Sequence, residues 1–133
     1  MKRAVFVLAA AMLAACDLLA GNFRLAGTVD LDARLRARAP RQNAMLFVVA
    51  KNAGGVPVAV QRIVNPDFPA AFEMGPDEEL VPSIKPGTPL TVEAVLNTRG
   101  DLGEPHPGDL VGRANAVVEP GAEGVSIVLN RAR

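Results

Sequence analysis

Cys16 is the side chain of this sequence best suited to covalent chemistry, because it is the only cysteine and a cysteine thiolate is a strong nucleophile. Three apolar residues, Leu13-Ala14-Ala15, lead directly into it. A single cysteine cannot form an intrachain disulfide. The sequence therefore predicts that the Cys16 sulfur carries a modification.

The residues before Cys16 have the order of a secretory signal peptide. Lys2 and Arg3 form a positively charged start, Ala4 to Leu13 is a continuous apolar run, and two alanines follow. The apolar run is far shorter than the roughly 20 residues that cross a bilayer. We therefore expect residues 1–15 to be an export signal rather than a membrane anchor.

The segment Leu13-Ala14-Ala15-Cys16 resembles the lipobox of bacterial lipoproteins. That resemblance implies that the cysteine sulfur receives a diacylglycerol, that the signal is cut before Cys16, and that the new N-terminus is acylated, for example with palmitate. Two or three acyl chains anchor a protein stably where one chain does not. We expect a protein held by lipid at the periplasmic face of the cell envelope. Asp17 resembles the retention signal of enteric bacteria, which favours the inner membrane over the outer membrane.

His106, the only histidine, lies between two prolines. A metal site with one histidine would need carboxylate ligands, and none is spaced as a recognisable motif. A nucleophilic triad would have to combine His106 with Ser83 or Ser126, and no nucleophile motif surrounds either serine. We therefore expect no catalytic residue, no metal and no cofactor, so that the protein is not an enzyme and His106 is an exposed loop residue.

Two groups of carboxylates allow either a functional or a structural interpretation. Asp30 and Asp32 share one face of an expected strand, and Asp77-Glu78-Glu79 is a short acidic cluster. Such groups can hold calcium or act as acid and base. Both lie at the ends of expected elements, where charged side chains are more commonly solvated.

One concentration of arginines also allows two interpretations: it comprises Arg34, Arg36, Arg38 and Arg41. In a helical turn, Arg34, Arg38 and Arg41 would share a face and could contact anionic lipid head groups near the expected anchor. A solvated helical face is the commoner outcome.

The composition of the chain after signal removal indicates one folded domain. Cleavage would leave 118 residues, enough for a single core. Two of the 14 basic residues lie in the signal, so 12 basic residues face 14 acidic ones, a formal net charge of −2. This balance gives no electrostatic case for binding nucleic acid.

The apolar pattern predicts an all-β domain. Alternating or continuous apolar stretches predict seven strands, with one or two helical turns over 32–39 and a turn-rich loop over 99–109. Pro66 and Pro69 place the fourth strand at a sheet edge, and Phe47 is expected in the core. Seven short strands without a long helix indicate an antiparallel β-sandwich. The expected strands are 23–31, 44–51, 57–64, 68–74, 90–97, 110–118 and 125–129.

With the strands in place, the segment 27–129 resembles the C-terminal periplasmic domain of the CycH/CcmI-type subunit of bacterial cytochrome c maturation. Four stretches in the same order carry the resemblance, together with Pro120-Gly121 before the last strand. They are Gly27-Thr28-Val29, Met45-Leu46-Phe47-Val48-Val49-Ala50-Lys51, Val56-Pro57-Val58-Ala59-Val60-Gln61-Arg62-Ile63 and Pro107-Gly108-Asp109-Leu110-Val111-Gly112.

The resemblance implies an immunoglobulin-like sandwich over residues 23–133. In chain order, the expected signal (1–15) and the expected lipidated tether (16–22) precede it. The resemblance also implies haem-lyase subunits or apocytochrome c as partners. In the family, this domain follows transmembrane helices and usually a tetratricopeptide domain, whereas here we expect a free-standing lipoprotein. Two functions therefore remain: a membrane-anchored accessory or scaffold of cytochrome c maturation that docks on proteins, or an envelope lipoprotein whose sandwich binds a peptide, glycan or other envelope partner.

Overall fold

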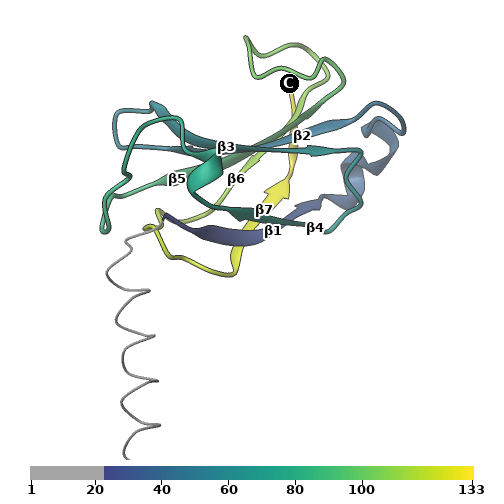
Figure 1. The fold of residues 1–133 in the computed structure, drawn as a ribbon. Coiled ribbons are helices and arrows are strands. Elements are labelled where there is room, and N and C mark those ends of the chain that lie inside the picture. The colour runs from purple at the N-terminus through teal and green to yellow at the C-terminus, as the bar shows by residue number, and fades with distance from the viewer. Residues whose placement is uncertain (1–22) are drawn as a thin grey trace, which may run out of the picture.

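The protein is a sandwich of two β-sheets in a computed structural model that describes residues 23–133 (Figure 1). One sheet has three strands in the order β4-β1-β7, and the other has five in the order β3-β2-β5-β6-β8. In chain order the elements are β1 (Leu25–Leu31), η1 (Ala33–Arg38), β2 (Met45–Lys51), β3 (Pro57–Val64), β4 (Ala70–Met74), η2 (Pro76–Glu78), β5 (Thr91–Asn97), β6 (Leu110–Arg113), β7 (Val125–Leu129) and β8 (Arg131–Ala132). The expected signal peptide (1–15) and the expected lipidated tether (16–22), with Cys16, lie outside the described residues.

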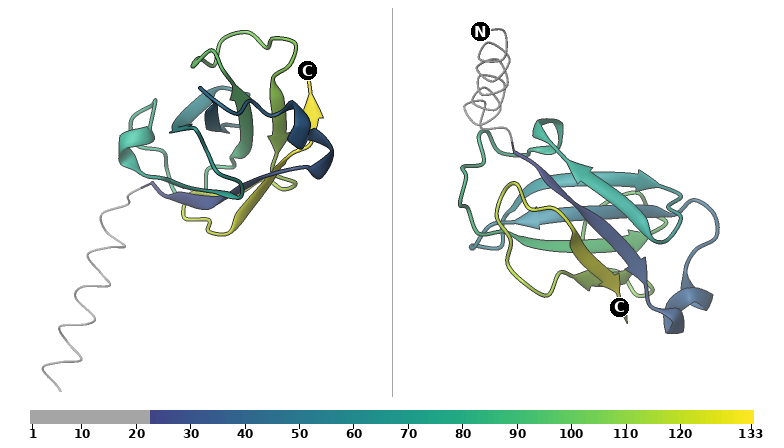
Figure 2. Two further views of the ribbon diagram at one scale, coloured as in Figure 1. Left: turned by 90° about the vertical axis from the view of Figure 1, so that its right-hand side faces the viewer. Right: turned by 90° about the horizontal axis from the view of Figure 1, so that it is seen from below.

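The two sheets differ in strand direction. Every neighbouring pair in the five-stranded sheet is antiparallel, and so is β1 with β4. β1 pairs with β7 in parallel, with Gly27 opposite Val125 and Leu31 opposite Leu129. Figure 2 shows the strands of the three-stranded sheet crossing those of the other sheet obliquely. The expected all-β immunoglobulin-like sandwich is confirmed, and it contains this one parallel pair.

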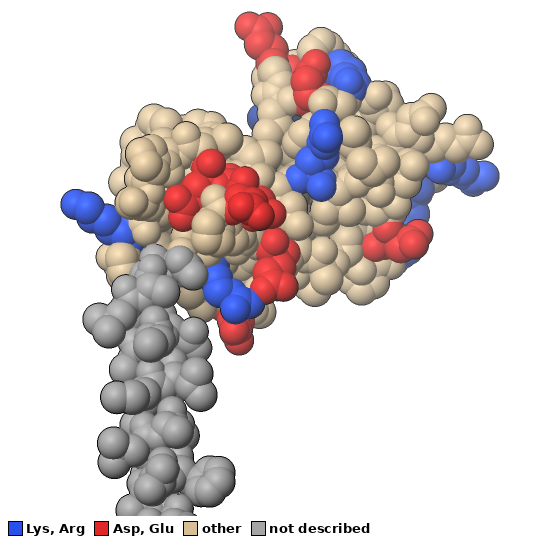
Figure 3. All heavy atoms as spheres, viewed as in Figure 1, with Lys and Arg blue, Asp and Glu red and all other residues tan. Residues whose placement is uncertain are grey.

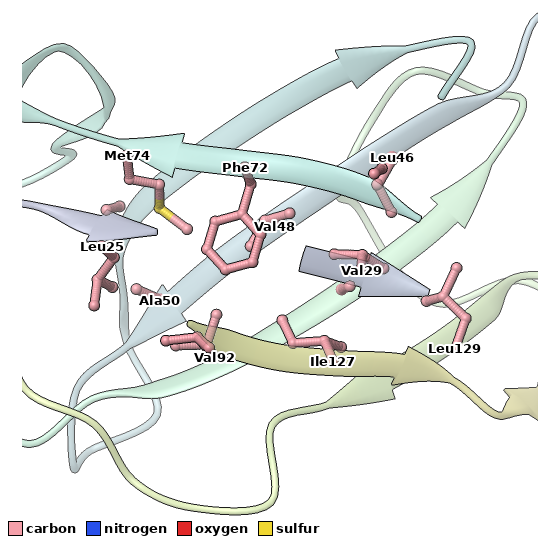
Figure 4. Close-up of a cluster of buried hydrophobic side chains, with 14 of the residues drawn as sticks. Leu25, Val29, Leu46, Val48, Ala50, Phe72, Met74, Val92, Ile127 and Leu129 are labelled. Atoms are coloured by element: carbon pink, nitrogen blue, oxygen red, sulfur yellow. The ribbon is translucent and has the colours of Figure 1, made fainter. Parts of the chain in front are cut away.

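The core lies between the sheets because alternate residues of each strand point inward. Leu25 and Val29 of β1 are fully buried, and Phe72 of β4 lies among them. Leu46, Val48 and Ala50 of β2 face this layer from the five-stranded sheet (Figure 4). The same alternation, seen in the sequence as a period of two, explains why the strands could be located from the sequence.

Two glycines allow a close approach to β7: Gly27 of β1 within the three-stranded sheet, and Gly112 of β6 from the other sheet. A Cβ on Gly27 would overlap the carbonyl oxygen of Val125, and one on Gly112 would overlap that of Val128. Any other residue would force the strands apart. These contacts give a physical reason for glycine in the stretches Gly27-Thr28-Val29 and Pro107 to Gly112.

The seven expected strands are all present, with some different bounds. β4 begins at Ala70 and lies at a sheet edge, as expected. β6 ends at Arg113 rather than at residue 118, because the chain bulges between Ala114 and Val118. At the two ends of the bulge, the backbone N–H of Ala114 donates to the carbonyl of Val92, and that of Val118 donates to the carbonyl of Leu90. The eighth strand, β8, was not predicted because it has only two residues.

Phe47 is buried, with 5% of its surface exposed, but it lies outside the layer between the sheets. In β2 the inward residues are Leu46, Val48 and Ala50, so Phe47 and Val49 point to the opposite face. The expectation that Phe47 is a core residue is confirmed by its burial, although its side chain points away from the partner sheet. A fully apolar strand does not reveal which of its faces meets the partner sheet.

Candidate docking site on the outer face of the five-stranded sheet

One row of side chains runs across all five strands on the outer face of the larger sheet. Directly opposite residues share a face of a sheet. The register places Phe47, Val95 and Val111 side by side, with an arginine at each end of the row. The ends are Arg62 on β3 and Arg131 on β8. We call the three central apolar residues, with Val49 and Val60 of the adjacent row, the apolar strip.

The row beside it carries one acidic and one basic side chain. Val60 and Val49 pair with each other, Val49 pairs with Glu93, and Glu93 pairs with Arg113. The Glu93 carboxylate lies 2.8 Å from the ammonium nitrogen of Lys51. The acidic side chain of this row is therefore already paired.

A groove of about 990 Å³ opens along the β5-β6-β8 side of this face. Thr91, Val95 and Val111 lie along it, and the bulge after β6 forms one wall. Val117 in that bulge is 63% exposed and adds an apolar side chain to the groove. Three exposed arginines also line the groove: Arg113, Arg131 and Arg133.

The loop between β5 and β6 closes one end of the outer face. Arg99 and Asp109, at its two ends, form a two-point ion pair with N–O distances of 2.7 and 3.0 Å. The Asp109 side chain is only 5% exposed. Asn97, also buried, accepts hydrogen bonds from the backbone of Arg99 and Gly100 and donates one to the carbonyl of Asp101. The expected loop is therefore present, and an ion pair and side-chain hydrogen bonds hold its two ends together.

The charge network at this base shifts the pKa of its members. The Arg99 side chain holds the pKa of Asp109 below its ordinary value, and the backbone N–H of His106 adds to the lowering, while burial opposes it. Asp109 in turn raises the pKa of Arg99. Both groups therefore stay ionised at neutral pH, which fixes the loop by charge-assisted hydrogen bonds.

His106 is exposed in this loop, as expected. Its ring nitrogen Nδ1 lies 2.7 Å from the carbonyl oxygen of Glu104, and its backbone N–H donates to Asp109. Ser83 and Ser126 are exposed, and neither forms a hydrogen bond with the histidine in the described part of the chain. Among residues 23–133, no three His, Cys, Asp or Glu side chains gather where they could hold a metal ion.

The carboxylate groups identified in the sequence have structural partners. Asp32 caps η1, accepting from the backbone and side chain of Arg34, and these bonds lower its pKa to about 2. Glu78 accepts from the backbone N–H of Gly75 at the start of η2. Asp30 is exposed, and its carboxylate accepts a hydrogen bond from the backbone N–H of Leu31.

The arginines near η1 do not form the face that the sequence suggested. η1 is a 3₁₀ helix that ends at Arg38, so Arg41 lies beyond it. All of β1 separates η1 from Phe23, where the described chain begins, and seven residues of strand span about 20 Å. Figure 2 shows η1 and the start of the described chain at opposite ends of the sandwich. Contact between these arginines and lipid at the anchor is therefore not favoured.

Acidic and basic side chains are interspersed over the visible surface (Figure 3). Acidic side chains gather over η2, which carries Asp77 and Glu78, and at the β5–β6 loop, which carries Asp101 and Glu104. No helix in the described part of the chain has both the length and the apolar character of a membrane span.

Residues 25–130 match the model of one protein family, the cytochrome c-type biogenesis protein H Ig-like domain. The match covers nearly the whole sandwich, including β1 to β7. The chain belongs to this family. An uncharacterized protein of Aquifex aeolicus (strain VF5) is 33% identical over 106 residues, which are 79% of this chain and 69% of that protein. No solved structure matches the chain significantly.

Membership of the CycH Ig-like family confirms the resemblance seen in the sequence and associates the chain with cytochrome c-type biogenesis. The structure gives roles to the stretch Pro107 to Gly112 of this CycH-type domain. Gly108, with φ of +95°, turns the chain and donates to the carbonyl of Arg133. The Asp109 carboxylate accepts hydrogen bonds from the Arg99 guanidinium, and Gly112, which has no side chain, leaves room for the carbonyl of Val128.

The groove of the CycH-type domain was not found from the sequence. Arg113 ends β6, whereas Arg131 lies in β8 and Arg133 directly follows it; a bulge, a turn and β7 separate the two strands, and β8 was not predicted. The only signal was the spacing of Arg131 and Arg133, two residues apart at the end of an apolar strand. Alternation of that kind places both side chains on one face.

Proposed function

We propose that this protein is a lipid-anchored accessory of cytochrome c maturation that docks on a partner protein at the periplasmic face of the envelope and performs no catalysis itself. The observation that carries the proposal is the family match over residues 25–130, which covers β1 to β7 and so most of both sheets. Haem-lyase subunits or apocytochrome c are the partners that this assignment favours.

The outer face of the five-stranded sheet supports docking as the mode of action. It combines the apolar strip with exposed arginines, and arginine is enriched at protein interfaces. Val64 on β3 and Val117 beside the groove are both more than half exposed. Isolated exposed valines are ordinary, but here they flank one face that already carries a groove.

The bonding of the reactive side chains supports a role without catalysis. The His106 ring bonds a carbonyl of its own loop, Asp32 caps η1, and Asp109 is committed to Arg99. A general base needs a free position toward its substrate. These side chains instead maintain local structure.

The lipid at Cys16 would raise the concentration of the domain near membrane partners, so that a modest interface suffices. The expected anchor precedes the start of β1, which belongs to the three-stranded sheet. The outer face of the other sheet lies on the opposite side of the sandwich (Figure 1). It would therefore be open to a partner, and Asp17 favours the inner membrane as the place of this encounter.

Site-specific photocrosslinking from native membranes tests this proposal. A photoreactive residue at Val117 should capture haem-lyase subunits or apocytochrome c. The same residue at Val128, which is 40% exposed on β7 of the other sheet, is the matched control and should not capture them. Capture of cell-wall or outer-membrane proteins alone would contradict the proposal and favour an envelope lipoprotein that binds a peptide, glycan or other envelope partner.

A further inference from the structure

We propose that the groove between β5, β6 and β8 binds an extended peptide segment of a partner protein that carries acidic side chains at alternate positions, followed by an apolar one. This inference deepens the proposed function, because it specifies the chemistry of the partner segment that the docking face recognises.

Uncompensated positive charge in the groove is the first argument. Arg113, Arg131 and Arg133 all line the groove, and no ion pair within residues 23–133 uses any of them. The carboxylates opposite two of them are already engaged: Glu93, opposite Arg113, binds Lys51, and Asp109, opposite Arg133, binds Arg99. The groove therefore presents three guanidinium groups, whose planar donors match carboxylates in a two-point geometry.

The spacing of the arginines is the second argument. Arg131 is opposite Val111 of β6, and the backbone of Arg133 bonds that of Asp109, so these two arginines mark two successive same-face positions. Arg113 itself is the next same-face residue of β6. Successive positions of this kind are about 6.8 Å apart.

An extended peptide places alternate side chains at the same interval of about 6.8 Å. Acidic residues at positions i, i+2 and i+4 of such a peptide would therefore each reach one arginine. Consecutive acidic residues would not, since neighbouring side chains point to opposite sides.

The apolar surface beside the arginines is the third argument. Val95 and Val111 lie in the same row as Arg131, beside the middle of the peptide, and the exposed Val117 lies in the bulge that follows Arg113 along the chain. The next same-side position of the peptide, i+6, would therefore meet Val117. Burying that surface adds affinity in proportion to its area, while the arginines define register.

Binding of a synthetic peptide to the full chain in nanodiscs of zwitterionic lipid tests the inference. The probe is a fluorescein-labelled peptide Glu-Ser-Glu-Ser-Glu-Ser-Val, and the readout is fluorescence anisotropy. Two control peptides have glutamine in place of glutamate, or the same residues reordered as Glu-Glu-Glu-Ser-Ser-Ser-Val. We expect the alternating glutamate peptide to bind most tightly, and added salt to weaken its binding.

The variant R113Q/R131Q/R133Q should weaken this binding roughly tenfold or more, since charge-assisted hydrogen bonds are lost. The matched control R36Q/R38Q/R41Q removes the same charge from η1 and its C-terminal flank and should change affinity less than about twofold. All six are exposed side chains, so both variants should fold.

Four results would overturn the inference: no binding of the alternating peptide, equal binding of either control peptide, equal loss in both variants, or loss of peptide binding when the nanodiscs contain anionic lipid. The last result would assign the arginines to lipid head groups. The assay concerns the groove alone, so it can fail while crosslinking to haem-lyase subunits succeeds, and the reverse also holds.

Discussion

Arg99 and Asp109 join the two ends of the β5–β6 loop through a pair of parallel hydrogen bonds, with the carboxylate almost completely buried. The backbone N–H of His106 donates to the same carboxylate. The loop therefore has a fixed base, although residues 101–108 are exposed. This loop borders the outer face on which the proposed function depends.

Asp109→Asn should release the loop. Replacing the charged acceptor weakens hydrogen bonds to it, and we expect a loss of about 1–3 kcal/mol in the free energy of unfolding. Backbone amides of residues 100–108 should exchange faster with solvent, as hydrogen-exchange mass spectrometry would measure. His106→Ala is the control, because it keeps the backbone N–H and should leave stability unchanged.

The acid dependence of stability checks the same pair. Because the pKa of Asp109 is lowered on folding, its contribution is complete above about pH 4 and is lost as the pH falls through the lowered pKa. The parent should therefore lose stability below about pH 4 more steeply than Asp109→Asn. Parallel curves for the two proteins would contradict the ion pair.

Phe47→Ala should destabilise the protein although Phe47 lies outside the layer between the sheets. Truncation of a buried phenylalanine costs about 3–5 kcal/mol. Because a cavity on the outer face can take up water, we expect Phe47→Ala to lower the free energy of unfolding by about 3 kcal/mol. Phe72→Ala, in the layer between the sheets, should lower it by more. Urea unfolding measures both, with the exposed Val64→Ala as a control within about 0.5 kcal/mol of the parent. Equal stability of the parent and Phe47→Ala would refute the burial of this ring.

Gly112→Ala should also be destabilising, because the added Cβ overlaps the Val128 carbonyl where the sheets meet. Overpacking of this kind costs about 1–3 kcal/mol or more. Gly103→Ala is the matched control: its φ is not positive, and the added Cβ makes only ordinary contacts. If thermal unfolding shows the two variants to be equally stable, the close approach of the strands is incorrect.

Cys16→Ser should abolish lipid attachment, since a hydroxyl cannot form the thioether. Mass spectrometry of the protein extracted from membranes should show a diacylglyceryl adduct at the mature N-terminus of the parent and none in the variant. An unmodified, membrane-free parent protein would contradict the lipoprotein assignment.

The sequence predicted the sandwich because strand alternation is a local property: Leu25, Val29 and the inward residues of β5 are visible as a period of two. It did not predict the parallel pairing of β1 with β7, since pairing between residues about 100 positions apart leaves no local pattern. The side to which Phe47 points could not be predicted, because every residue of its strand core is apolar. The arginine groove arises only when β6 and β8 pair.

The central claim, that the protein acts in cytochrome c maturation, is tested most directly by the amount of covalently bound haem in membranes. The measurement compares the parent strain with a strain from which the gene is deleted, and with the deletion strain that carries the gene again. We predict that haem staining of c-type cytochromes falls on deletion and returns with the restored gene. Unchanged staining under every respiratory condition would contradict the account.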